Sequence, residues 1–222
     1  MSDGLPPLGL YVHWPYCARI CPYCDFNVVR DRGQPQQADL AAAIVRDLEG
    51  QATRIGPRRL ASIFFGGGTP SLMKPEWVHA IVEASLRLWP TNAPVESSLE
   101  ANPTDAEAAH FRGFADAGVQ RLSLGLQSFD DDALRFLGRN HSADEATRAA
   151  ALAARLFPRL SVDMIYALPG QTEQAWTNQL AAAVDLGAEH ISPYQLTVEA
   201  GTAFDRLVQG ASFRPVEEDL AA

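Results

Sequence analysis

The chain has 222 residues, of which 47% are hydrophobic and 20% are charged, and its formal net charge is −9. This composition is typical of a globular protein with a sizeable core, and we expect a single domain. The acidic balance argues against nucleic acid as a partner, because binding to a phosphate backbone needs a surface rich in lysine or arginine. Neither a secretory signal nor a stretch of roughly 18 apolar residues is present, so we expect a cytoplasmic protein without a membrane span.

Short apolar runs, rich in β-branched and aromatic residues, alternate with longer amphipathic stretches six times along the chain. Such runs are typical of buried strands. They lie at residues 9–14, 60–66, 94–101, 120–128, 159–168 and 190–198. Because the runs are nearly continuous in apolar residues, they predict a sheet that is covered on both faces.

Helix starts can be recognised between these runs. Pro75 suits a first helical position, and Thr104 with Glu107 and Ser142 with Glu145 have the spacing of a capping box. Strands that alternate with helices predict parallel pairing through right-handed crossovers. The fold class is therefore α/β, as either a parallel barrel or a doubly wound sheet.

Unusual polar and glycine-rich segments follow the ends of the expected strands. They are the cysteine-containing loop after the first strand, GGGTP at 66–70, EANP at 100–103, LQSF at 126–129, and Asp163 with LPGQT at 168–172. Parallel α/β folds bind ligands at the carboxyl ends of their strands. The sequence therefore predicts one site on one edge of the sheet.

All three cysteines, Cys17, Cys21 and Cys24, lie within eight residues. An odd number of thiols in a reducing compartment favours metal binding over disulfides. Structural zinc with His13 as a fourth ligand is one interpretation, although zinc sites usually pair their ligands in two knuckles. An iron–sulfur cluster suits three closely placed thiolates better, and it would leave one of four irons open to a small molecule.

The spacing C-x3-C-x2-C resembles the signature of the radical S-adenosylmethionine (radical SAM) superfamily, in which the open iron binds SAM. The resemblance runs from about Tyr11 to the last strand. It implies a parallel (β/α)6 partial barrel, a [4Fe–4S] cluster on the three cysteines and SAM as a cofactor. We expect a tail at residues 1–9, the radical SAM core at 10–205, and at 206–222 the start of a connection to a C-terminal part that is missing.

The same resemblance implies nine SAM contacts. They are Tyr11, Tyr23, Gly67, Gly68, Thr69, Glu100, Gln127, Arg139 and Asp163. The glycines with Thr69 match the segment at the methionine amino end, and Glu100 matches a Glu-x-x-Pro carboxylate. Gln127 and Asp163 match ribose-binding positions, and Arg139 matches the partner of the SAM carboxylate.

Each of these residues also has a plainer interpretation. The glycines could serve only a tight turn, Arg139 could cap the end of the preceding helix, and Tyr23 could belong to the core. His141, close to Arg139, would ordinarily be a cap or a surface group. The sequence alone leaves these alternatives open.

Within the superfamily the chain is similar to the oxygen-independent coproporphyrinogen III dehydrogenases and to their relatives, the HemW-like heme chaperones. The dehydrogenases carry a further cysteine two residues after the third, and a long N-terminal extension. Here Asp25 and Phe26 follow Cys24, and ten residues precede Tyr11. Both departures favour a chaperone that holds heme and passes it to an acceptor protein.

That resemblance further implies an electron donor and a heme or porphyrin as partners, with the heme-binding residues beyond the end of this chain. Whether the protein also cleaves SAM as an enzyme stays open. Two alternatives remain: a coproporphyrinogen dehydrogenase, which would decarboxylate propionates by radical oxidation, and a non-enzymatic zinc-binding α/β scaffold.

Overall fold

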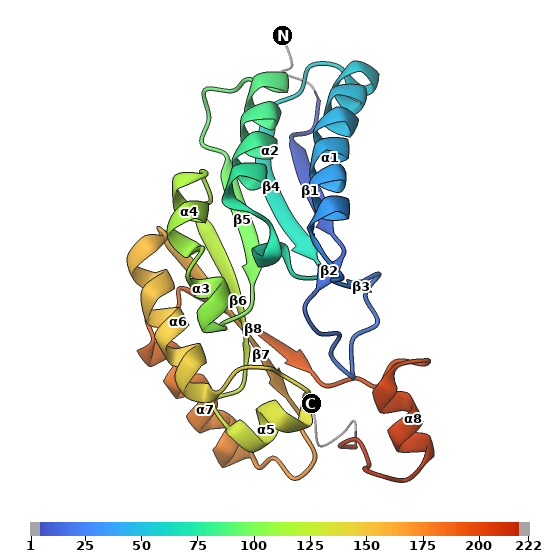
Figure 1. The fold of residues 1–222 in the computed structure, drawn as a ribbon. Coiled ribbons are helices and arrows are strands. Elements are labelled where there is room, and N and C mark those ends of the chain that lie inside the picture. Colours follow the sequence, from blue (N-terminus) through green and yellow to red (C-terminus); the bar gives the residue numbers. More distant parts are fainter. Residues whose placement is uncertain (1–4, 218–222) are drawn as a thin grey trace.

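The computed structural model describes residues 5–217, and a six-stranded parallel sheet forms its centre (Figure 1). The strands are β1 (Leu8–Trp14), β4 (Leu60–Gly67), β5 (Glu96–Ala101), β6 (Arg121–Gln127), β7 (Arg159–Tyr166) and β8 (His190–Gln195). Their order in the sheet is their order in the chain, so each strand pairs with its predecessor. In a doubly wound sheet the order of the strands would reverse partway across the sheet. The observed order does not reverse, so that alternative is wrong. The expected (β/α)6 partial barrel is confirmed, with β1 and β8 at its two edges.

Helices connect successive strands along the outside of the curved sheet, and a last helix follows β8 and lies beside the cysteine loop (Figure 1). They are α1 (Gln34–Ile55), α2 (Pro75–Leu88), α3 (Asp105–Ala108), α4 (Phe111–Asp116), α5 (Asp131–Phe136), α6 (Ala143–Leu156), α7 (Glu173–Asp185) and α8 (Ala203–Gln209). A 3₁₀ turn, η1 (Pro70–Leu72), follows β4, and a small sheet pairs β2 (Tyr16–Cys17) with β3 (Val29–Arg30).

The expected helix starts are confirmed with one difference. Pro75 begins α2, and Ser142 with Glu145 forms a complete capping box at the start of α6. Thr104 caps α3 through the backbone N–H of Glu107. The Glu107 carboxylate, however, accepts hydrogen bonds from Ser71 and Asn102 and does not complete a box at Thr104.

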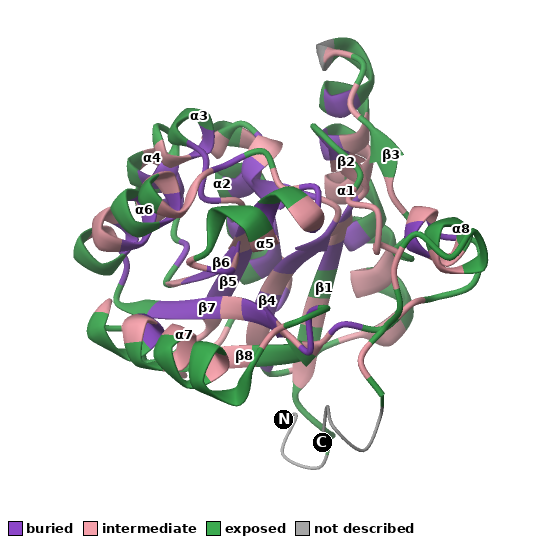
Figure 2. Ribbon diagram, turned by 90° about the horizontal axis from the view of Figure 1, so that it is seen from below, coloured by how far each residue is buried: buried purple, intermediate pink, exposed green. Residues whose placement is uncertain are grey.

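The core lies between the outer face of the sheet and the helices. Phe65, Leu99 and Leu122 point to this face and are fully buried. The inner face differs from the expectation of cover on both sides, because it carries polar groups such as Glu100 and Asp163, and the edge strand β8 has no buried residue (Figure 2). Alternation along each strand therefore separates an apolar outer face from a polar inner face.

Helix α8 docks on a second, smaller apolar cluster. Its Phe204 is 2% exposed and packs with Leu137 and Leu196, and its backbone N–H donates to the Pro22 carbonyl at 2.9 Å. The expected boundary at 205/206 therefore falls within this helix, and β1 begins at Leu8, inside the expected tail. The remaining parts of the two expected terminal segments, 1–4 and 218–222, lie outside the described residues.

None of the helices within residues 5–217 is both long enough and apolar enough to cross a bilayer.

Replacing Phe204 by alanine should release α8 from the loop that holds the cysteines. The ring packs against Phe136 at 4.9 Å and Phe213 at 5.1 Å between ring centroids, and loss of a buried phenylalanine costs about 3 kcal/mol. Hydrogen exchange should become faster in residues 203–209 and 17–26 but not in β4 to β6. Leu207→Ala, on the exposed side of the same helix, is the control and should leave exchange unchanged. Unaltered exchange in Phe204→Ala would contradict the docking role.

Candidate functional site

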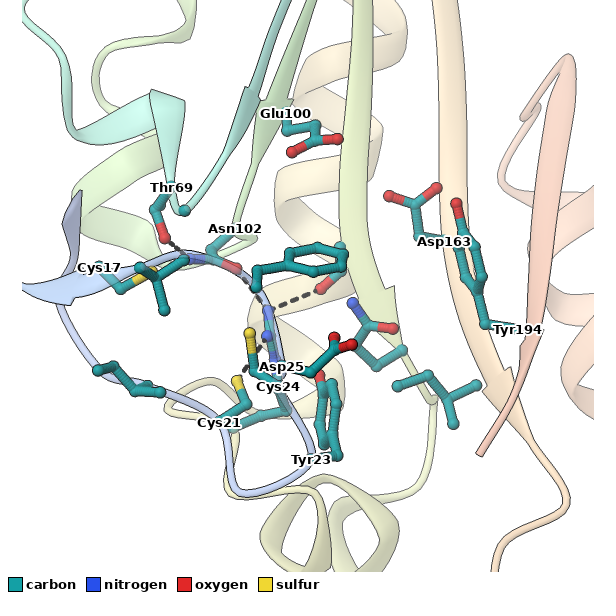
Figure 3. A pocket seen from close by; sticks show the side chains of 18 of the residues that line it. Cys17, Cys21, Tyr23, Cys24, Asp25, Thr69, Glu100, Asn102, Asp163 and Tyr194 are labelled. Atoms are coloured by element: carbon teal, nitrogen blue, oxygen red, sulfur yellow. Dashed lines mark hydrogen bonds between the residues drawn. The ribbon is translucent and has the colours of Figure 1, made fainter. Parts of the chain in front are cut away.

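A cavity of about 390 Å³ lies where the carboxyl ends of the strands meet the cysteine-containing loop (Figure 3). All but one of the residues expected at the site line this cavity. They are Cys17, Cys21, Tyr23, Cys24, Gly67, Gly68, Thr69, Glu100, Gln127, Arg139 and Asp163. The parallel topology brings these residues together from six separate segments of the chain.

Tyr11 is the exception. Its side chain is 61% exposed on β1, stacks on Phe64 with a centroid separation of 6.1 Å, and does not line the cavity. Tyr11 lies three residues before the carboxyl end of β1, and its hydroxyl is 3.5 Å from His13 Nδ1. The expected contact of Tyr11 with SAM stays a prediction.

The cysteines occupy the loop between β1 and α1, and the β2–β3 pairing ties the two ends of this loop together. Cys17 is buried, Cys21 and Cys24 are partly exposed, and all three are free thiols. Burial raises the pKa of Cys17 and of Cys24. Arg139 donates a hydrogen bond from Nη1 to the Cys21 sulfur at 3.2 Å, so a fixed cation lies beside the thiols.

His13, the expected fourth ligand of a zinc ion, is engaged through one of its ring nitrogens. The His13 imidazole donates from Nε2 to the Asn27 carbonyl at 3.0 Å and thereby holds the exit of the cysteine loop. In residues 5–217, no three His, Cys, Asp or Glu side chains gather as ligands of one metal ion do. The thiolate ligands of a four-iron cluster each bind a different iron, so this donor set fits a cluster better than a single zinc ion.

The glycine segment after β4 is pressed against the cysteine loop. Gly67 has a φ of +109° and donates its N–H to Glu100 at 3.3 Å. A Cβ on Gly68 would lie 2.7 Å from the Pro15 carbonyl oxygen, while the Thr69 N–H donates to the Tyr16 carbonyl at 2.9 Å. The glycines are therefore needed for close packing, and the same packing exposes backbone to the cavity.

Two carboxylates, Glu100 on β5 and Asp163 on β7, face the cavity. Burial, and next the negative charge of Asp163, raise the pKa of Glu100 to about 7, while the Gly67 amide opposes this shift. Burial also raises the pKa of Asp163, which accepts a hydrogen bond from Ser123 Oγ at 3.2 Å. Such a pair suits a ligand that brings a positive charge and hydroxyl groups.

The Arg139 side chain turns into the cavity, while its backbone helps to end α5. Its Nη2 donates to the Gly125 carbonyl at 3.0 Å and to Asn102 Oδ1, and its Nε is buried with no partner within the described residues. The backbone N–H donates to the Leu134 carbonyl at 2.9 Å, so the residue takes part in the helix cap and its side chain does not. A buried donor without a partner is expensive and indicates room for an acceptor from a ligand.

Gln127 ends β6 in an unusual backbone conformation. Its φ is +68°, and the pairing of β6 with β7 shifts register just before it. A non-glycine residue in this region is strained, and such strain concentrates at ligand sites. The shift turns the Gln127 amide into the cavity.

The surroundings of Tyr23 and His141 differ from those that the sequence suggests. Tyr23 lines the cavity and also packs near Phe204 at 6.2 Å between centroids, so it belongs to the smaller apolar cluster, and its contact with SAM stays a prediction. His141 is 6% exposed, and its Nε2 donates to the Leu126 carbonyl at 3.2 Å. Burial lowers the pKa of His141 to about 4, so it is a neutral internal tether and not a surface group.

Sequence reasoning missed Asn102, Ser123 and Tyr194, which also line the cavity (Figure 3). Asn102 stands in the same EANP segment as Glu100. Ser123 lies four residues before Gln127 on β6, and Tyr194 lies near the end of β8. The two-residue period of a strand could have found Ser123, because positions two and four apart share a face.

Replacing Gly138 by alanine should disturb the cysteine loop. A Cβ there would lie 2.6 Å from Pro22 Cδ, at a φ of +69°. Reconstituted Gly138→Ala should therefore hold less iron per chain than the unaltered protein. Gly170→Ala is a matched control, since its φ is +76° but no atom lies within 4 Å, and it should show only backbone strain. Equal iron content in both variants would contradict the contact argument.

Replacing Glu100 by glutamine should stabilise the ligand-free protein at high pH. The folded pKa of about 7 lies above the ordinary glutamate value of 4.5, so ionisation costs stability progressively as the pH rises between these values. The gain should be on the order of 3 kcal/mol above pH 7 and absent near pH 4.5. Urea unfolding at several pH values measures it, with the exposed Glu83→Gln as control. A gain that does not change with pH would contradict this prediction.

Curated relatives share this sequence over essentially its whole length. The chain is 44% identical to the cattle (Bos taurus) protein "Radical S-adenosyl methionine domain-containing protein 1, mitochondrial", with 100% of this chain and 50% of the relative covered. It is 40% identical to the Haemophilus influenzae "Heme chaperone HemW", with 90% and 54% covered, and 39% identical to the Escherichia coli HemW, with 90% and 53% covered. The chain thus spans about half the length of these relatives.

Among solved structures, the Escherichia coli coproporphyrinogen III oxidase HemN is similar with a TM-score of 0.77 and 23% identity, covering 93% of this chain and 52% of HemN. This likeness concerns the fold. The family model described as "Radical SAM superfamily" matches residues 11–178, from β1 into α7. That match covers most of the chain, and the chain belongs to the radical SAM superfamily.

Proposed function

We propose that the cavity binds a [4Fe–4S] cluster on Cys17, Cys21 and Cys24 with SAM beside it. The observation that carries the proposal is the convergence of three thiols with Glu100 and Arg139 on one cavity. The family implies both cofactors, and the residues present suit them, since thiolates are the usual ligands of iron–sulfur clusters.

The remaining charges suit SAM, which carries a sulfonium, an amino and a carboxylate group. The carboxylates of Glu100 and Asp163 would accept from the amino group and from ribose hydroxyls. The unpartnered Nε of Arg139 would donate to the carboxylate. Backbone at Gly67 and Gly68 would contact the amino end of the ligand.

A reduced cluster, when bound, supplies the electron for reductive cleavage of SAM. The protein's own residues orient the ligand and limit water: Tyr23 is largely buried beside the thiols, and Gln127 and Tyr194 border the opening toward β8. Positioning of this kind is the usual contribution of a protein whose cofactor carries the chemistry.

We further propose that this chain is the radical SAM core of a HemW-like heme chaperone, which binds heme and hands it to an acceptor protein. Support comes from identities near 40% to proteins named heme chaperone HemW. The absence of a cysteine at position 26, where Phe26 stands, agrees with this choice. Heme, the acceptor and the electron donor are parts of the proposal.

Coproporphyrinogen dehydrogenation is the second candidate, favoured by the structural similarity to HemN. That similarity concerns the fold, and Phe26 stands here where the resemblance implies a further cysteine in the dehydrogenases. The cytoplasmic location expected from the sequence remains a prediction, because the name of the cattle relative includes the word mitochondrial.

Replacing Cys21 by serine should abolish the cluster. Anaerobically reconstituted protein should be brown and should be bleached by dithionite, whereas Cys21→Ser should lose visible absorbance and iron because one of the three thiolate ligands is gone. Ala18→Ser, an exposed change in the same loop, is the control. A colourless protein with one zinc per chain would support the zinc scaffold instead.

A protein of the relatives' full length that contains this chain should bind heme and should form no protoporphyrinogen from coproporphyrinogen. Optical titration with heme measures the first property. Product analysis with SAM and a reductant measures the second. Formation of protoporphyrinogen would overturn the chaperone assignment in favour of the dehydrogenase.

A further inference from the structure

Glu107 is a buried acid that does not line the cavity. It lies on α3, is 5% exposed, and receives hydrogen bonds from the Ser71 hydroxyl, from the Asn102 backbone N–H at 3.1 Å and from Thr104 Oγ1 at 3.4 Å. A buried carboxylate is costly unless donors surround it. Four donors, counting the Asn102 side chain, converge on this one, which is more than a helix cap requires.

Asn102 connects this acid to the cavity. Its Nδ2 donates to Glu107 Oε1 and to Thr69 Oγ1, each at 3.4 Å, so its Oδ1 faces the guanidinium of Arg139. An amide has one accepting and one donating end. The acceptor Glu107 on one side therefore determines that the oxygen lies on the Arg139 side; the reverse orientation would place donor against donor.

The orientation of Asn102 in turn restrains Arg139. Nη2 is held by Asn102 Oδ1 and by the Gly125 carbonyl, and Nη1 is held by the Cys21 sulfur. With both terminal nitrogens engaged, the guanidinium plane is set, and Nε is the nitrogen left without a partner among residues 5–217. Loss of the Asn102 contact would free the plane to rotate.

We propose that Asn102, oriented by Glu107, is a positioning residue that sets Arg139 and Thr69 for SAM. The inference rests on the proposed function, because it concerns how the SAM pocket is held. Asn102 acts through its neighbours, and Glu107 acts through Asn102. A purely structural role for the pair would instead stabilise α3 and leave SAM affinity unchanged.

The first experiment compares Asn102→Ala with the unaltered chain after anaerobic reconstitution. Iron content, the SAM dissociation constant from calorimetry, and the change that SAM causes in the electron paramagnetic resonance spectrum of the reduced cluster are measured. We expect full iron content, a dissociation constant raised about tenfold, as for one lost hydrogen bond to a charged group, and a smaller spectral change. Asn178→Ala, an exposed asparagine on α7, should match the unaltered protein.

The second experiment separates orientation from stability. Glu107→Gln should weaken SAM binding to a similar extent, and the double variant with Asn102→Ala should bind no more weakly than Asn102→Ala alone. Ser71→Ala removes another donor from Glu107 but leaves the Asn102 side-chain contacts, so it should lower the melting temperature without changing SAM affinity. If Glu107→Gln does not fold, Ser71→Ala and Asn102→Ala still test the proposal.

The outcomes distinguish this inference from the proposed function. If the unaltered protein holds a cluster but does not bind SAM, the proposed function fails. If it binds SAM and Asn102→Ala binds equally well, only the inference fails. Loss of iron from Asn102→Ala, or independent and additive effects of the two substitutions, would also overturn it.

Discussion

The placement of one buried cation, Arg139, is the constraint on which the site depends. A guanidinium removed from water must find acceptors, and this one takes them from three parts of the chain: the Cys21 sulfur, the Gly125 carbonyl and Asn102 Oδ1. The cysteine loop, β6 and the segment after β5 are thereby held around one point. The same group supplies a positive charge beside thiols that must be ionised to bind iron.

Close backbone contacts complete this arrangement. Gly68 lies against Pro15, and Gly138 lies against Pro22, with no room for a Cβ at either position. Phe204 of α8 closes the loop from the other side. The cysteine loop is thus held at both ends and at its middle, which is what a loop lacking regular hydrogen bonding needs in order to present three ligands in one geometry.

The polar and strained groups of the cavity lower the stability of the protein without ligand. Burial and the negative charge of Asp163 disfavour ionisation of Glu100, burial disfavours ionisation of Asp163, and Gln127 is strained. Groups of this kind lower the stability of the ligand-free protein, and binding of a cationic ligand would offset this loss. This pattern supports a binding site at the strand ends and explains why polar residues interrupt otherwise apolar strands.

The alternation of short apolar runs with amphipathic stretches predicts the six strands and their parallel arrangement, and strand-end position predicts most of the cavity residues, because both are local properties of the chain. The tertiary structure was needed to learn that the Arg139 side chain turns into the cavity and that Glu107 lies against Asn102. Each of these depends on a contact between residues distant along the chain, or on where one strand ends relative to another. Such contacts are set by packing and hydrogen-bond satisfaction in three dimensions, which no local pattern encodes.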